Sequence, residues 1–138
     1  MYINGKFVES RSGKWIDVLN PSTEDVCSRQ PEGTVEDVEE ALDAARAAQK
    51  SWEKTPAIER AAYLSKMADG IRKREKEFVE IIMREQGKTR SWAQIEVGAT
   101  IAYFDYMASF ARHIEGEIIQ SDNRGETIFL SKKPIGVV

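Results

Sequence analysis

Apolar residues recur with a helical period through most of the chain between residues 34 and 114. The spacing predicts three to four helices, over about 35–52, 56–73, 75–86 and 89–114. In the first segment charged residues occupy one face, which is the pattern of an amphipathic helix packed on its other side. The expected core face of that helix is Val38, Leu42, Ala45 and Trp52.

Capping residues predict where these helices begin and end. Thr34 can accept from the first backbone N–H groups, and Asp37 is its capping-box partner three positions on. Thr55, followed by a proline, is the expected N-cap of the second helix. The charge-dense residues 72–77 predict a kink or brief break, and Gly87 predicts a C-cap in the left-handed region.

The segment 89–114 has no polar face. Between residues 91 and 111 the only formal charges are Glu96 and Asp105, which lie on opposite sides of a helix. A helix that is apolar all round is normally buried on every side. Two apolar stripes are expected: Trp92, Ile95, Ala99, Ala102, Tyr106 and Phe110, and Val97, Ile101, Phe104, Ala108 and Ala111.

Short strands are predicted at both ends of the chain. Residues 1–33 contain a hairpin around Asn4 and Gly5 and two further extended runs. Residues 116–138 form a loop and a strand over Thr127–Lys133. The apolar run that follows this strand should be paired or covered, because a free apolar edge invites association.

Composition excludes several classes of protein. Hydrophobic residues make up 41% and charged residues 31% of the 138 positions, and the net charge of −3 offers no basic surface for nucleic acid or an anionic membrane. No apolar run is long enough to span a bilayer, and the first residues lack the pattern of a signal peptide. We therefore expect a cytoplasmic protein with neither nucleic-acid nor membrane partners.

No catalytic constellation is visible in these residues. Cys27 is the single cysteine and His113 the single histidine, and they are far apart in sequence. The triplet beginning at Gly87 resembles the end of a phosphate-binding loop, but position 82 is Ile where that motif needs glycine. A helix cap is the preferred interpretation of Gly87, and a buried strand residue that of Cys27.

Several stretches taken together resemble the N-terminal segment of the NAD(P)-dependent aldehyde dehydrogenase superfamily. They are NPSTEDV, the run from EDVEEALDAARAAQKSWEK to REQGKT, EGEII and KKPIGVV, in that order. Within the superfamily the chain is most similar to the lactaldehyde and glycolaldehyde dehydrogenase branch. The resemblance implies that the chain is a segment of an α/β fold, mostly α as it stands, with short strands at both ends.

The resemblance also implies a reaction for a longer parent protein. Family members oxidise an aldehyde through a cysteine thiolate, hydride transfer to NAD or NADP, and hydrolysis assisted by a glutamate. The matching positions would all follow Val138, and Cys27 does not match the nucleophile. We therefore expect the segment alone to be inactive and to bind no cofactor. Its expected partners are the rest of the dehydrogenase polypeptide, further copies in a dimer or tetramer, and a small aldehyde.

Two sites are carried over by the resemblance. A monovalent cation would be held by the backbone carbonyls of Val18 and Leu19 and the side chain of Glu85, unless Glu85 merely lies near a helix end. The helix 89–114 would line a substrate channel, unless its residues are simply core. The positions that match channel residues are Ile95, Ala99 and Tyr103.

An alternative from a different class remains open. The chain could be a stand-alone, non-catalytic helical interaction module. Its all-apolar helix would then pack against a partner chain or against a second copy.

Overall fold

The computed structural model describes residues 1–138. Its elements are β1 (Tyr2–Ile3), β2 (Lys6–Phe7), β3 (Trp15–Leu19), β4 (Val26–Pro31), α1 (Val35–Trp52), α2 (Ala57–Lys73), α3 (Glu75–Gln86), α4 (Arg90–Ser109), a 3₁₀ turn η1 (Phe110–Arg112), β5 (Glu117–Gln120) and β6 (Thr127–Leu130). Four helices with short strands confirm the predicted composition of the fold. None of the helices combines the length and apolarity needed to cross a bilayer.

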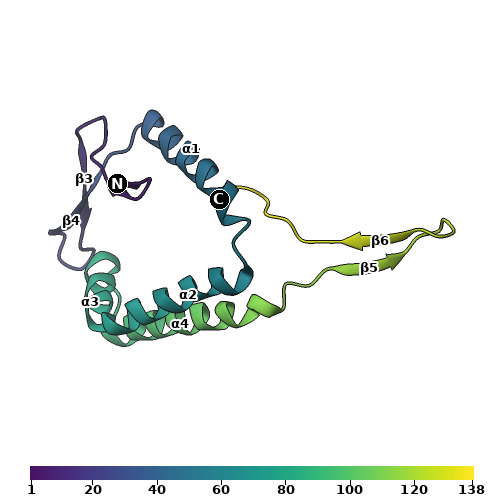
Figure 1. The fold of residues 1–138 in the computed structure, drawn as a ribbon. Coiled ribbons are helices and arrows are strands. Elements are labelled where there is room, and N and C mark those ends of the chain that lie inside the picture. The colour runs from purple at the N-terminus through teal and green to yellow at the C-terminus, as the bar shows by residue number, and fades with distance from the viewer.

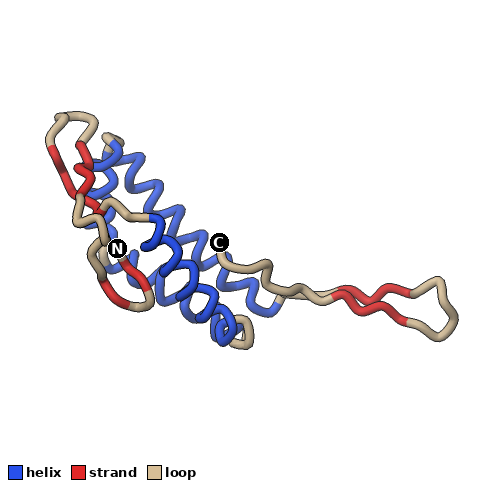
Figure 2. The backbone as a smooth tube through the Cα atoms, turned by 90° about the horizontal axis from the view of Figure 1, so that it is seen from above, coloured by secondary structure: helices blue, strands red, loops and turns tan.

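The helices form two groups (Figure 1). α2 and α4 run side by side, α3 packs at one end of the pair, and β4 contacts α3. α1 stands apart from this group and contacts β1. β5 and β6 form an arm that projects away from the helices, and the view from above shows the same projection (Figure 2).

The predicted caps are present at the start of α1 and the end of α3. Thr34 Oγ1 accepts from the backbone N–H of Asp37 at 3.2 Å, and the Asp37 carboxylate accepts from the N–H of Thr34 at 2.9 Å. Gly87 follows α3 with φ of 66°, the left-handed conformation of a C-cap glycine. The break in the charge-dense segment falls at Arg74, between α2 and α3.

The predicted N-cap of α2 is wrong by one residue. Pro56, rather than Thr55, takes the N-cap position, and no side chain caps the helix. The Thr55 carbonyl accepts from Arg60 Nη1, so Thr55 contacts the first turn of α2 through its backbone. The backbone N–H groups of Glu59 and Arg60 donate to the Pro56 carbonyl, so no hydroxyl is needed as their acceptor.

The last helix is shorter than the predicted 89–114. α4 ends at Ser109, whose Oγ donates to the Tyr106 carbonyl at 2.6 Å. That carbonyl would otherwise accept the N–H of Phe110, which bonds instead to nearer carbonyls and begins η1. A local side-chain hydrogen bond therefore ends the α-helix before residue 114.

Two hairpins form the N-terminal strands. Asn4 and Gly5 join β1 to β2 with φ of 49° and 76°, the positive values that a type I′ turn requires. β3 pairs antiparallel with β4, and a bulge interrupts the ladder between Val18 and Leu19.

The C-terminal strand is one half of a hairpin. β6 pairs antiparallel with β5, which the sequence analysis missed. The four residues of β5, Glu-Ile-Ile-Gln, do not alternate between apolar and polar, so no strand pattern marks them. Its pairing with β6 across the intervening loop identifies this strand.

The apolar run after β6 is expected to be paired or covered, and pairing within this chain is wrong. Residues 131–138 form no strand, and the Ile135 side chain is 95% exposed. Leu130 pairs with Glu117, the first residue of β5, so β5 offers no partner to the residues after Leu130. Pro134, which lacks a backbone N–H, further prevents a continuous ladder.

The core lies where α2, α3 and α4 meet. Ala68 on α2 and Ala93 on α4 are fully buried, with relative exposures of 0%. Their small side chains allow the helix axes to approach closely. Val79, Val97 and Ile101 complete the cluster, and five partly buried residues surround it: Ile71, Phe78, Ile82, Met83 and Phe104.

Only one of the two apolar stripes of α4 is packed. The stripe containing Val97 faces α2 and α3, whereas Trp92 and Ile95 on the other stripe are 64% and 57% exposed. The expected core face of α1 is also uncovered, since Val38 is 55% exposed. Within this chain α4 is not buried on every side, because its two neighbouring helices cover only one side of it.

The uncovered faces give the chain an unusually large surface. A compact protein of 15.6 kDa exposes roughly 7,200 Å², whereas this chain exposes 11185 Å². The difference is about 4,000 Å². Only nine residues are buried, and many large apolar side chains remain exposed.

Asp37 joins the N-terminal loop to the start of α1. Its carboxylate is buried and accepts from Ser10 Oγ at 2.9 Å and from the N–H of Arg11 at 3.3 Å, besides the N–H of Thr34. The Thr34 hydrogen bond is the largest cause that holds the pKa of Asp37 below its ordinary value, and Ser10 and Arg11 add to it against the opposing effect of desolvation.

Replacing Asp37 with Asn should destabilise the protein in a pH-dependent way. Because the folded pKa is lowered, the carboxylate contributes stability above its unfolded pKa of about 4, and this contribution is lost as pH falls towards the folded pKa. The difference in urea midpoint between wild type and Asp37→Asn should therefore be largest near neutrality and shrink below about pH 4. A difference that is independent of pH would contradict this assignment.

Candidate functional site

The three predicted channel residues lie together on the exposed face of α4. Ile95, Ala99 and Tyr103 are four residues apart, so they fall within about 80° of one another around the helix. Tyr103 is 66% exposed, and all three side chains point away from the packed stripe of Val97. The structure thus brings these residues together on one uncovered surface.

This surface carries two adjoining shallow hollows that share Glu96. One is lined by Lys88, Thr89, Trp92, Ile95 and Glu96. The other is lined by Glu96, Ala99, Thr100, Tyr103 and Phe104. The Glu96 carboxylate is ion-paired with Lys88, and Thr100 Oγ1 donates to the Glu96 carbonyl at 2.8 Å.

Aromatic rings continue from the second hollow towards the end of α4. The ring centroids of Tyr103 and Tyr106 lie 6.4 Å apart, and those of Tyr106 and Phe110 lie 4.8 Å apart in an edge-to-face arrangement. Phe110 in turn contacts the His113 ring, with centroids 5.9 Å apart. Sequence reasoning placed Tyr106 in an apolar stripe but missed its contact with Tyr103.

A third hollow, also missed from sequence, lies where the end of α4 meets the start of α2. Its volume is about 450 Å³, and its lining is mainly apolar, with Arg60, His113 and Lys132 supplying polar groups. These residues come from four separate segments, so no local motif marks them. The apolar lining residues include Trp52, Leu64, Met107, Phe110 and Ile114.

The predicted cation ligands lie near one another but are not in mutual contact. Glu85 Oε1 accepts from Ser28 Oγ at 3.1 Å, and Ser28 pairs with Val18 across the β3–β4 ladder. The Val18 carbonyl accepts from Cys27 Sγ at 3.3 Å. No three acidic, histidine or cysteine side chains are grouped to hold a metal, so a ligand set here needs other oxygen atoms, of which backbone carbonyls are one source.

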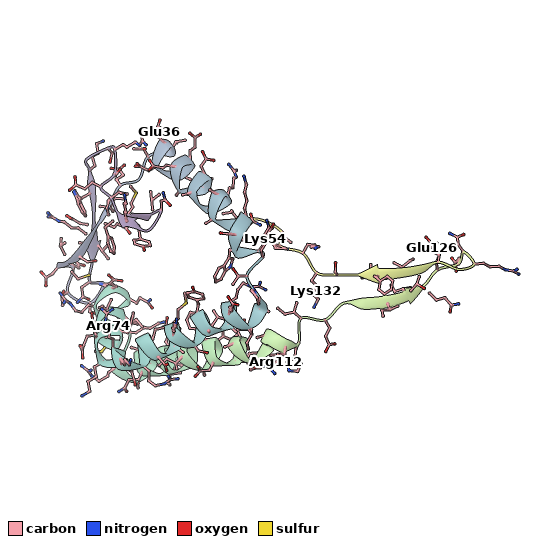
Figure 3. All side chains as sticks on the ribbon, in the orientation of Figure 1. Glu36, Lys54, Arg74, Arg112, Glu126 and Lys132 are labelled. Carbon is pink, nitrogen blue, oxygen red and sulfur yellow. The ribbon has the colours of Figure 1, made fainter.

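Cys27 and the histidine-bearing end of α4 are widely separated. β4, which carries Cys27, lies beside α3, whereas η1 lies at the opposite end of α4 (Figure 1). Figure 3 labels Arg112 in η1 and Arg74 at the far end of the same helical group. The fold therefore does not bring the thiol and the imidazole together, and Cys27 and His113 form no nucleophile–base pair.

Gly87 fits tightly against the turn that follows β3. A Cβ atom at this position would lie 2.9 Å from Pro21 Cγ and 3.2 Å from Ser22 Oγ. The left-handed φ also disfavours any side chain. Gly87 therefore allows the end of α3, and with it Glu85, to lie beside the β3–β4 hairpin.

We predict that Gly87→Ala destabilises the protein by more than about 1 kcal/mol, because it combines an unfavourable φ with a steric clash. Gly70→Ala is a matched control, since a Cβ at Gly70 meets nothing within 4 Å and its φ is ordinary for a helix. Urea unfolding of the two variants measures the contrast. Equal midpoints for both variants would contradict the close fit at Gly87.

Two known proteins are similar in sequence to nearly the whole chain. Lactaldehyde dehydrogenase of Escherichia coli K12 is 53% identical over 137 residues, covering 99% of this chain and 29% of that protein. A 3,6-anhydro-alpha-L-galactose dehydrogenase from Vibrio is 38% identical over 138 residues, covering 100% of this chain and 29% of that protein. The chain thus spans less than a third of the length of these relatives.

Solved structures show the same likeness. The crystal structure of lactaldehyde dehydrogenase from Escherichia coli superposes with a TM-score of 0.90 at 53% identity, covering 94% of this chain and 27% of that one. A structure of 3,6-anhydro-L-galactose dehydrogenase in complex with NAP gives a TM-score of 0.87 at 36% identity, with the same coverage of 94% and 27%. A family model described as the aldehyde dehydrogenase family matches residues 7–138. The chain belongs to the aldehyde dehydrogenase family.

Proposed function

We propose that the polypeptide carrying this segment oxidises a small hydroxyaldehyde, such as lactaldehyde or glycolaldehyde, to the corresponding acid with NAD or NADP. The observation that carries the proposal is the 53% identity to a lactaldehyde dehydrogenase across nearly the whole segment. The exposed stripe of α4 supports it, because it is a coherent apolar surface without a partner in these residues.

The role of this segment is to supply one wall of the substrate channel. Ile95, Ala99 and Tyr103 offer a largely apolar face to a small substrate. The remainder of the polypeptide supplies the nucleophile, the base and the groups that bind the cofactor. Cys27 is unsuited to covalent catalysis, since its thiol donates to the Val18 carbonyl and has no base nearby.

This assignment predicts a clear difference between two preparations. The full-length protein should reduce NAD or NADP in the presence of glycolaldehyde or lactaldehyde, followed by absorbance at 340 nm. Residues 1–138 alone should give no turnover, because no thiol in this segment has a base partner. Turnover by the segment alone would contradict the division of roles, and a full-length protein inactive on both aldehydes would contradict the function.

We also propose that Val18, Leu19 and Glu85 hold a monovalent cation. Backbone carbonyls and a carboxylate are suitable ligands for a hard cation, and the bulge between Val18 and Leu19 disturbs the ladder next to Ser28, the residue that contacts Glu85. A site that orders the hairpin against α3 would stabilise the fold by binding only the native state. The competing interpretation is that Glu85 serves only to accept from Ser28.

Replacing choline chloride with KCl or NaCl at equal ionic strength should raise the melting temperature of the full-length protein, and Glu85→Ala should abolish this rise. Glu75→Ala is the matched control on the same helix, and it should retain the rise. A rise of equal size in Glu85→Ala would show that Glu85 is not a ligand.

The arm formed by β5 and β6 supports a homo-oligomer, a dimer or a tetramer. Ile118 and Phe129 lie opposite each other on the arm and are 74% and 73% exposed. A two-stranded hairpin with both faces open is marginally stable by itself, so packing against another copy would stabilise it. Light scattering of the full-length protein measures this state, and a strictly monomeric protein would contradict the proposal.

A stand-alone interaction module is the second candidate, and the exposed stripe of α4 is the observation that favours it. That module would bind a partner chain through α4 and carry out no chemistry. The mass of the protein isolated from its natural source distinguishes the two candidates. A natural mass of 15.6 kDa favours the module, and a mass several times larger favours the dehydrogenase.

A further inference from the structure

Tyr103 is the side chain in its hollow that can donate a hydrogen bond to a bound molecule. Its hydroxyl makes no hydrogen bond within the chain, whereas the Thr100 hydroxyl already donates to the Glu96 carbonyl. The Glu96 carboxylate has no proton to donate and is paired with Lys88. The remaining lining residues, Ala99 and Phe104, are apolar.

The ring of Tyr103 is held from one side. It rests against Tyr106 at a tilt of 31°, and Tyr106 packs edge-to-face on Phe110 at 66°. Phe110 also lines the hollow between α2 and α4, so this end of the row is in contact with the packed part of the molecule. On the other side Ala99, one turn earlier, is small and leaves space beside the hydroxyl-bearing ring.

We propose that Tyr103 selects aldehydes that carry a hydroxyl next to the carbonyl, by donating a hydrogen bond to that hydroxyl, and that Tyr106 positions the Tyr103 ring. The proposal rests on the proposed function of α4 as a channel wall. A phenol in an apolar channel needs a partner, because a hydroxyl that loses water without replacement is costly. A hydroxyaldehyde supplies that partner, and the corresponding simple aldehyde does not.

Glycolaldehyde and acetaldehyde form the matched substrate pair, because they differ by this one hydroxyl. In the full-length protein, Tyr103→Phe should lower the ratio of kcat/KM for glycolaldehyde to kcat/KM for acetaldehyde by about tenfold, the typical effect of one lost hydrogen bond. The loss should appear mainly as a higher KM for glycolaldehyde, because the bond is made in the bound substrate as well as in the transition state.

Tyr106 is tested by paired variants. Tyr106→Ala removes the supporting ring and should lower the same ratio, whereas Tyr106→Phe keeps the ring and should retain the wild-type ratio. If thermal melting shows that the alanine variant is unfolded, Tyr106→Leu takes its place as the variant without the ring. Tyr63→Phe is the control, since Tyr63 lies on α2 against Trp52 and outside the α4 hollows.

Three outcomes each overturn a different claim. An unchanged ratio in Tyr103→Phe, with wild type active on both aldehydes, overturns the assignment of Tyr103. Equal losses in Tyr106→Phe and Tyr106→Ala overturn the positioning role, because the ring would then not matter. A wild-type protein that oxidises neither aldehyde with NAD or NADP overturns the proposed function, and the selection by Tyr103 with it.

Discussion

The close approach of α2, α3 and α4 at Ala68 and Ala93 is the contact on which the rest of this segment depends. Both alanines are fully buried, so any larger side chain there would force the helices apart. This packing commits the Val97 side of α4 to the core. The opposite side is thereby left free, and the proposed channel residues Ile95, Ala99 and Tyr103 lie on it.

Polar and steric contacts place the N-terminal loop and strands against the helices. Asp37 gathers three donors from the N-terminal loop and the first turn of α1, and Gly87 lets the turn after β3 lie against the end of α3. Neither contact buries much apolar area. They fix where the strands lie, whereas the alanine contact fixes how the helices lie.

The exposed apolar faces acquire a meaning from the comparisons. The chain spans about 29% of the length of the lactaldehyde dehydrogenase that it resembles, and about 4,000 Å² of extra surface is of the size found at interfaces between domains or subunits. Tyr103 is exposed and does not belong to the core. In the proposed channel, this exposure makes its unpaired hydroxyl available to a substrate.

Short-range features were determined by the sequence itself. The Asn4–Gly5 turn, the Thr34 cap, the break at Arg74, the Gly87 cap and the family membership all follow from neighbouring residues or from their order along the chain.

Only the tertiary structure decided which stripe of α4 is packed and that β5 pairs with β6. It also decided that Glu85 meets Ser28 and that the Tyr103 ring rests on Tyr106. Helical periodicity shows that a face is apolar, but whether that face is buried depends on what the rest of the polypeptide places against it.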